Sequence, residues 1–196
     1  MGTHLSREEL AEIVREAQQG SLESFHRLYQ FYSGAIYNFV WRLVGERSDA
    51  EDLTQETFLK AHSELKKLRD PGQFKYWLYQ IARNEVYQKL RKSQRATVVS
   101  IDDGEVPYYD LLEDGSSGLD PEAKVLALEL NRVLHEALDA MAPKYRDVFV
   151  LAVFQKESYE NIAKVVGRSL LSVKTDIYRA RLAVKEQLNR YLKQRK

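Results

Sequence analysis

The chain has 196 residues, enough for one large domain or two small ones, and 44% of them are hydrophobic, so each half can form a core. It contains no cysteine, which excludes disulfides, thiolate chemistry and a cysteine-ligated zinc site. It has neither a run of about 18 apolar residues nor a basic-then-apolar leader, so we expect a cytoplasmic protein without membrane insertion.

In chain order, the first half is predicted to be helical. Capping patterns at Ser6–Glu9, Ser21 and Ser48–Glu51 start three helices. The pattern breaks at Pro71-Gly72, and a fourth helix follows over Phe74–Leu90. No alternating strand pattern of useful length occurs, so the expected fold class is all-α.

The middle of the chain, residues 96–122, is predicted to be a flexible acidic linker. Residues 96–123 carry 8 Asp/Glu and no Lys/Arg, and glycines and a proline interrupt any helical period. Residues 1–95 carry 15 Lys/Arg against 13 Asp/Glu, whereas residues 124–196 carry 15 against 8. A basic second half favours a polyanionic partner.

The second half is predicted to end in a helix-turn-helix. Helices over 123–141 and 143–154 precede Ser158–Val166, a turn at Gly167 and a helix over Ser169–Leu192. The exposed sides of the last helix carry, in its first three turns, residues of the kind that contact DNA bases: Leu171, Lys174, Thr175, Tyr178 and Arg179. A plain helical hairpin with solvated charges is the alternative. The sequence therefore predicts two small helical domains, 1–95 and 123–196, joined by the linker 96–122.

Three segments resemble signatures of one known family. Residues 158–181, SYENIAKVVGRSLLSVKTDIYRAR, resemble region 4 of bacterial sigma factors; residues 49–62, DAEDLTQETFLKAH, resemble their region 2 core-binding helix; and residues 74–92, FKYWLYQIARNEVYQKLRK, resemble their promoter-melting helix. With the three segments in this order and at this separation, the chain is similar to the extracytoplasmic-function (ECF) sigma factors of the sigma-70 family.

The resemblance implies roles for residues of the first half, the region 2 domain. Asp52, Gln55 and Glu56 match positions that bind the coiled coil of the RNA polymerase β′ subunit. The loop 66–74 matches one that cups a base flipped out of the non-template strand. The residues implied in −10 DNA binding are basic or amide side chains: Lys66, Lys67, Arg69, Asn84, Lys89, Arg91 and Lys92.

In the second half, the region 4 domain, the resemblance implies a −35 reading helix. The matching residues are Ser172, Lys174, Thr175, Tyr178 and Arg179. Asp176 stands where the family usually has Arg, and we expect it to repel phosphate. Leu171 and Asn161 are further departures from the family pattern. The implied partners are core RNA polymerase, through its β and β′ subunits, promoter DNA and an anti-sigma factor. The linker is implied to thread toward the RNA exit path.

Other function classes are weighed against this interpretation. A helix-turn-helix regulator that acts without core polymerase would share the second half but would have no use for the acidic face of residues 52–56. An adaptor that binds only proteins would not need a DNA-reading helix. The four histidines are scattered and no glycine-rich phosphate loop is present, so we expect no enzyme, metal, cofactor or small-molecule substrate.

Overall fold

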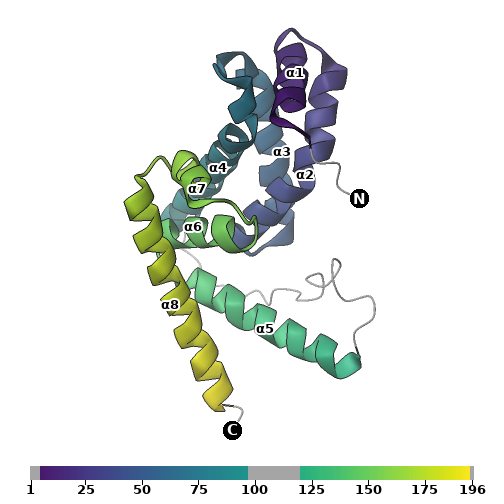
Figure 1. Ribbon diagram of the computed structural model, residues 1–196. Coiled ribbons are helices and arrows are strands. Elements are labelled where there is room, and N and C mark those ends of the chain that lie inside the picture. The colour runs from purple at the N-terminus through teal and green to yellow at the C-terminus, as the bar shows by residue number, and fades with distance from the viewer. Residues whose placement is uncertain (1–4, 97–119, 195–196) are drawn as a thin grey trace.

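The structure, a computed structural model, describes residues 5–96 and 120–194 as helices and short connections. No strand occurs among these residues, and the predicted all-α class is confirmed. The helices form two groups that face each other, with the first half above the second in Figure 1. Residues 97–119 of the predicted linker 96–122 lie outside the described residues; Ala96 ends α4, and α5 begins at Pro121.

The first half contains four α-helices and two 3₁₀ turns: α1 (Arg7–Gln18), α2 (Leu22–Val44), α3 (Arg47–Glu64), turns at Leu65–Lys67 and Pro71–Gln73, and α4 (Phe74–Ala96). The capping box of Ser6 and Glu9 is confirmed. The expected cap at Ser48 is wrong, because the side chain of Glu46 accepts from the backbone of Ser48 and starts α3 earlier. Glu51 instead forms an ion pair with Arg47 at 3.2 Å.

The second half contains α5 (Pro121–Asp139), α6 (Pro143–Val153), α7 (Tyr159–Val166) and α8 (Leu170–Gln194). Ser158 caps α7, and Gly167 ends it with φ of 66°, the left-handed conformation that glycine adopts readily. Ser169 caps α8, because its hydroxyl accepts from the backbone of Ser172 at 3.2 Å. The predicted helix-turn-helix is therefore α7, the turn and α8.

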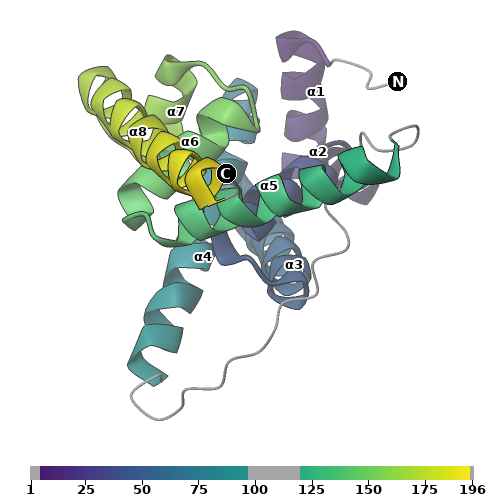
Figure 2. The ribbon, with the colours of Figure 1, turned by 90° about the horizontal axis from the view of Figure 1, so that it is seen from below.

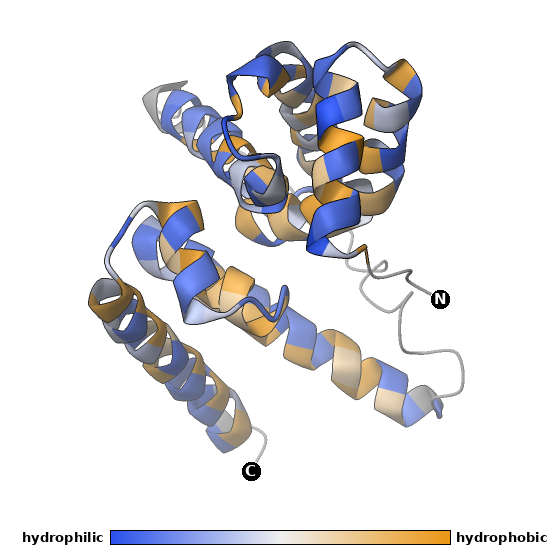
Figure 3. Cartoon of the chain, turned by 45° about the horizontal axis from the view of Figure 1, so that its top comes forward, coloured by the Kyte–Doolittle hydropathy of each residue, from blue (hydrophilic) through white to orange (hydrophobic). Residues whose placement is uncertain are grey.

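The buried residues of both halves form one continuous hydrophobic cluster. Figure 3 shows hydrophobic and hydrophilic residues interleaved along the helices, as expected for helices with one buried face. Helix α6 differs, because the five consecutive residues from Asp147 to Leu151 are all buried. Five consecutive residues span more than a full turn, so α6 is covered on every side, by its own half and by the first half.

Candidate functional site

The fully exposed face of α3 carries the residues implied in polymerase binding. Its opposite face is buried through Leu53, Phe58 and other apolar residues, and the helical period then places Asp52, Gln55 and Glu56 outward. Leu59 lies on the same face, one turn after Gln55 and Glu56, and it is 71% exposed. The sequence reasoning missed Leu59. An exposed leucine three to seven residues from the three polar positions is the signal that could have found it.

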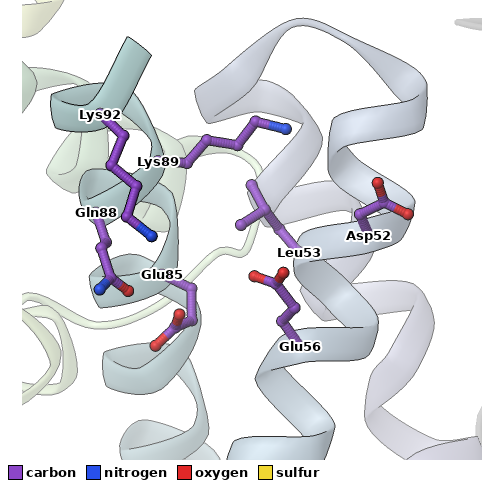
Figure 4. Close-up of a pocket in the computed structure, with 7 residues that line it drawn as sticks. All are labelled: Asp52, Leu53, Glu56, Glu85, Gln88, Lys89 and Lys92. Carbon is purple, nitrogen blue, oxygen red and sulfur yellow. The ribbon is translucent and has the colours of Figure 1, made fainter. Parts of the chain in front are cut away.

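A groove of about 230 Å³ separates α3 from α4 next to this face (Figure 4). Helix α3 lines it with Asp52, Leu53 and Glu56, and α4 lines it with Glu85, Gln88, Lys89 and Lys92. Glu85 accepts from Lys60 of α3 at 2.5 Å, which ties the two helices together. The groove therefore joins the proposed polymerase face to part of the proposed −10 surface.

The loop before α4 carries three of the predicted −10 residues, Lys66, Lys67 and Arg69, and all three are exposed. Gln18 of α1 holds this loop, because its side-chain amide donates to the carbonyls of Leu65 at 3.0 Å and Leu68 at 2.8 Å. Sequence reasoning missed Gln18, since its contact depends on residues about fifty positions away. The loop is thus a positioned platform for its three cations.

Helix α4 presents its predicted −10 residues on two different sides. Asn84, Arg91 and Lys92 are exposed. Lys89 instead lies toward α3 and forms an ion pair with Asp49. Lys89 and Lys92 both line the groove between α3 and α4, whereas Asn84 and Arg91 do not.

The recognition helix α8 exposes Lys174, Thr175, Tyr178 and Arg179, as the helical period predicts. Arg179 does not extend freely: its Nη1 donates to the hydroxyl of Tyr145 at 2.9 Å. This hydrogen bond lowers the pKa of Tyr145. Tyr145 of α6 was not foreseen as part of this surface.

Two hydroxyl groups of the recognition helix lie within hydrogen-bonding distance of residues about one turn earlier. Ser172 lies in the first turn, with its Oγ 2.9 Å from the Oγ of Ser169. Thr175 donates to the carbonyl of Leu171 at 3.0 Å. Lys174, Tyr178 and Arg179 are the longer exposed side chains among the predicted −35 residues.

The position of Asp176 in the structure contradicts the expectation that its carboxylate repels phosphate. Its residue is 8% exposed and its carboxylate forms an ion pair with Arg168 in the turn. Arg168 also donates to the carbonyl of Lys144 at 3.1 Å and to Asp147 at 3.3 Å. Asp176 therefore stabilises the helix-turn-helix internally, and it adds no charge to the exposed face of α8 that is predicted to bind DNA.

Metal-ligand clusters and membrane-spanning helices are both absent from residues 5–96 and 120–194. Across these residues, no group of three or more His, Asp or Glu side chains is arranged to hold a metal ion. No helix within residues 5–96 or 120–194 is long and apolar enough to cross a membrane.

Comparison with known proteins gives matches to both halves. The model of sigma-70 region 2 matches residues 28–96, and that of sigma-70 region 4 matches residues 131–184. The RNA polymerase sigma-H factor of Pseudomonas aeruginosa is 30% identical over 194 residues, which cover 97% of this chain and 99% of that protein. The ECF RNA polymerase sigma factor SigW of Bacillus subtilis is 28% identical over 179 residues, covering 89% and 94%.

Two solved structures share the fold. CnrH, in complex with the cytosolic domain of CnrY, has a TM-score of 0.67 and 23% identity, covering 92% of this chain and 97% of CnrH. The sigma factor RpoE of Bartonella quintana, in complex with the anti-sigma factor NepR, has a TM-score of 0.67 and 24% identity, covering 86% and 98%.

Proposed function

Because the chain belongs to the ECF group of the sigma-70 family of RNA polymerase sigma factors, we propose that its two halves divide promoter recognition between them. Sigma factors are transcription initiation factors rather than enzymes: they bind core RNA polymerase and direct it to promoter DNA. In this division the domain 1–95 binds the polymerase and reads the −10 element, the domain 123–196 reads the −35 element, and the protein works in the cytoplasm.

The exposed face of α3 is the proposed contact with the β′ coiled coil. A face with two carboxylates, one amide and an exposed leucine suits a basic amphipathic partner helix, since it offers acidic groups next to one apolar anchor. This face is the observation that favours a sigma factor over a regulator that acts alone. Asp52, Gln55, Glu56 and Leu59 are the residues involved.

The proposed −10 surface combines the loop cations with Asn84. The side-chain amide of Asn84 offers a donor and an acceptor to a base edge. Lys66, Lys67 and Arg69 lie at the other end of the surface, where unpaired bases and phosphates need positive charge. On α8, Arg179 offers a fork to guanine and Lys174 a point charge.

Control by an anti-sigma factor is also proposed. RpoE of Bartonella quintana was solved with its anti-sigma factor, and its chain shares this fold over most of its length. A protein that contacts both halves at once would keep α3 and α8 from their partners.

The test of the proposed function is co-elution with core RNA polymerase in size-exclusion chromatography. We expect the purified chain to co-elute with the core enzyme in the absence of DNA. A chain that binds promoter DNA by itself but never joins the core enzyme would instead be a helix-turn-helix regulator.

A further inference from the structure

The last residue of α1, Gln18, reaches the loop before α4, which comprises residues 65–73. Its side-chain amide donates one hydrogen bond to the carbonyl of Leu65 at 3.0 Å and another to the carbonyl of Leu68 at 2.8 Å. A carboxamide has two N–H donors, so both of them are used on this loop. The two carbonyls flank the first turn of the loop, Leu65–Lys67, and one side chain thus fixes both ends of that turn.

The end of α1 that carries Gln18 is itself held in place. Val14 is fully buried in the core, and the carboxylate of Glu16 accepts from the hydroxyl of Ser24 in α2 at 2.5 Å. Gly20, with a φ of 102°, then turns the chain directly into α2. Figure 1 and Figure 2 both show α1 beside α2. Gln18 therefore extends toward the loop from a fixed helix end.

The two anchored residues also turn their side chains toward the protein. Leu65 is buried, and Leu68 packs against the core. The three cationic side chains of the loop, by contrast, are exposed. Because the carbonyls of Leu65 and Leu68 are paired with α1, their oxygens are kept away from the outer side of the loop, where they would repel phosphate. The loop therefore presents its cations outward without these two acceptors beside them.

A second contact joins α1 to the same loop. Arg7 pairs with Asp70 at 3.6 Å, and the two side chains are 73% and 55% exposed. Exposed ion pairs of this kind contribute little to stability. The carboxylate of Asp70 also accepts from the backbone of Gly72 at 3.0 Å, which stabilises the second turn of the loop locally. The hydrogen bonds of Gln18 are partly shielded from water, and they are therefore the stronger tie between α1 and the loop.

We propose that Gln18 is a positioning residue for −10 recognition, which holds the loop in the conformation that receives an unpaired base of the non-template strand. This inference rests on the proposed function, in which the loop forms one end of the −10 surface. Without the Gln18 amide, the carbonyls of Leu65 and Leu68 lose a donor, and the loop takes more than one conformation. Ordering the loop then costs free energy when the base binds. The loss should appear at the base that the loop holds, and not at a base that Asn84 contacts.

The first arm of the test measures the order of the loop in the free chain. Because the chain has no cysteine, a spin label on Lys66→Cys reports this position only. Gln18→Met keeps an unbranched side chain of similar length without donors, and we expect it to sharpen the lines of the label's spectrum, as faster motion does. Gln19→Met, the same change at the next, exposed position, should leave the spectrum of the parent. A spectrum that Gln18→Met leaves unchanged would overturn the proposal.

The second arm measures base preference. The chain without the label, assembled with core polymerase, selects from a pool of single-stranded DNA with a randomised centre, and the bound strands are sequenced. Gln18→Met should lower the enrichment at one base position by roughly fivefold, the discrimination expected of about one base contact. The other positions should be unchanged, as should every position in Gln19→Met. Gln18→Lys, which restores donors on a side chain of similar length, should recover part of the preference.

The possible outcomes of this selection separate the inference from the proposed function. Uniform weakening at all positions would give Gln18 a merely structural role, and a pattern identical to that of the parent would give it none; either result would overturn the inference. If the parent complex enriches no base at any position, the proposed function itself is contradicted, and the inference with it.

Discussion

Arg168 and Asp176 form an ion pair between the turn of the helix-turn-helix and the inner side of the recognition helix. The side chains are 23% and 11% exposed, so the pair is largely removed from water. Arg168 makes a second contact with the fully buried Asp147. The family usually carries Arg at position 176, whereas in this chain Asp176 stabilises the turn through its ion pair with Arg168.

Replacing Asp176 by Arg should therefore destabilise the protein rather than tighten DNA binding. The new guanidinium would face Arg168 and leave two cations in a mostly buried place, a loss on the order of 3 kcal/mol in the free energy of unfolding. Urea denaturation measures it, with Glu186→Arg, an exposed acid-to-Arg change on the same helix, as the matched control. Unchanged stability with higher DNA affinity would show that Asp176 does face phosphate.

Two changes on α3 should weaken polymerase binding. Glu56→Lys reverses a charge on the proposed β′ face, and Leu59→Ala removes its exposed apolar side chain. Each should cost roughly tenfold in affinity for core polymerase, or about 1.4 kcal/mol. Binding is measured by fluorescence anisotropy. Glu23→Lys, an exposed reversal on α2, serves as the control. Equal affinities for all three variants and the parent would place the interface elsewhere.

Loss of the Asn84 amide should act on promoter melting. Asn84→Ala should lower open-complex formation by about 1–3 kcal/mol, while initial closed-complex binding changes little, because the partner base is exposed only after strand separation. Permanganate footprinting gives the open fraction. Gln88→Ala, at an exposed position one turn further along α4, should behave as the parent. If both steps weaken equally, Asn84 has a structural role.

Arg179 and Lys174 should contribute differently to −35 binding, Arg179 to base preference and Lys174 mainly to affinity. Arg179→Ala should relax the preference at one base pair, because a planar fork is lost. Lys174→Ala should lower affinity with a weaker change in preference. Tyr145→Phe, which removes the hydroxyl that holds Arg179, should give a milder form of the Arg179→Ala effect. Competition binding on promoter variants separates these cases, and uniform weakening by Arg179→Ala would exclude base reading.

Mild acid should weaken the packing of the two halves of the chain against each other through protonation of His135. This residue packs on Trp41 of the first half, with the ring centroids 4.8 Å apart. Burial, with Arg42 and Arg146 nearby, lowers its pKa to about 4. An exposed histidine has a pKa of about 6.5. This packing is thus most stable above about pH 6.5 and loses stability as the pH falls toward 4, because its disruption takes up a proton.

Spin labels on Gln30→Cys of α2 and Asn189→Cys of α8, both exposed positions, measure this effect as a broadening of the distance between the two halves from about pH 7.5 to about pH 5.5. Asp139, ion-paired with Arg146, has a pKa raised by burial and acts in the opposite sense. His135→Phe isolates the histidine, and we expect it to reduce the acid-induced broadening. Identical broadening with phenylalanine would assign the pH response to other groups.

Local signals in the sequence predicted local structure well. The box of Ser6 with Glu9, the cap at Ser158 and the glycine turn at Gly167 depend on residues a few positions apart, and all are present. The start of α3 was misplaced because Glu46, an uncommon cap, competes with Ser48. The exposed faces of α3 and α8 followed from the helical period.

Contacts between distant residues could not be predicted in the same way. Arg83 and Asp147 are 64 positions apart, and nothing near either residue in the sequence indicates the other. The same holds for Gln18 with the loop carbonyls and for Arg179 with Tyr145. Asp176 was misjudged because its partner, Arg168, comes from the turn and is seen only once the turn is folded.

The central claim is that this chain directs core polymerase to promoters with two defined elements. Run-off transcription from a library randomised upstream of the start site tests it most directly, with transcripts sequenced and compared with the input. We expect transcripts only when the chain is added, with fixed sequences enriched at −10 and −35 at one spacing. The assignment would be contradicted if no sequence were enriched at either element, or if core polymerase alone gave the same transcripts.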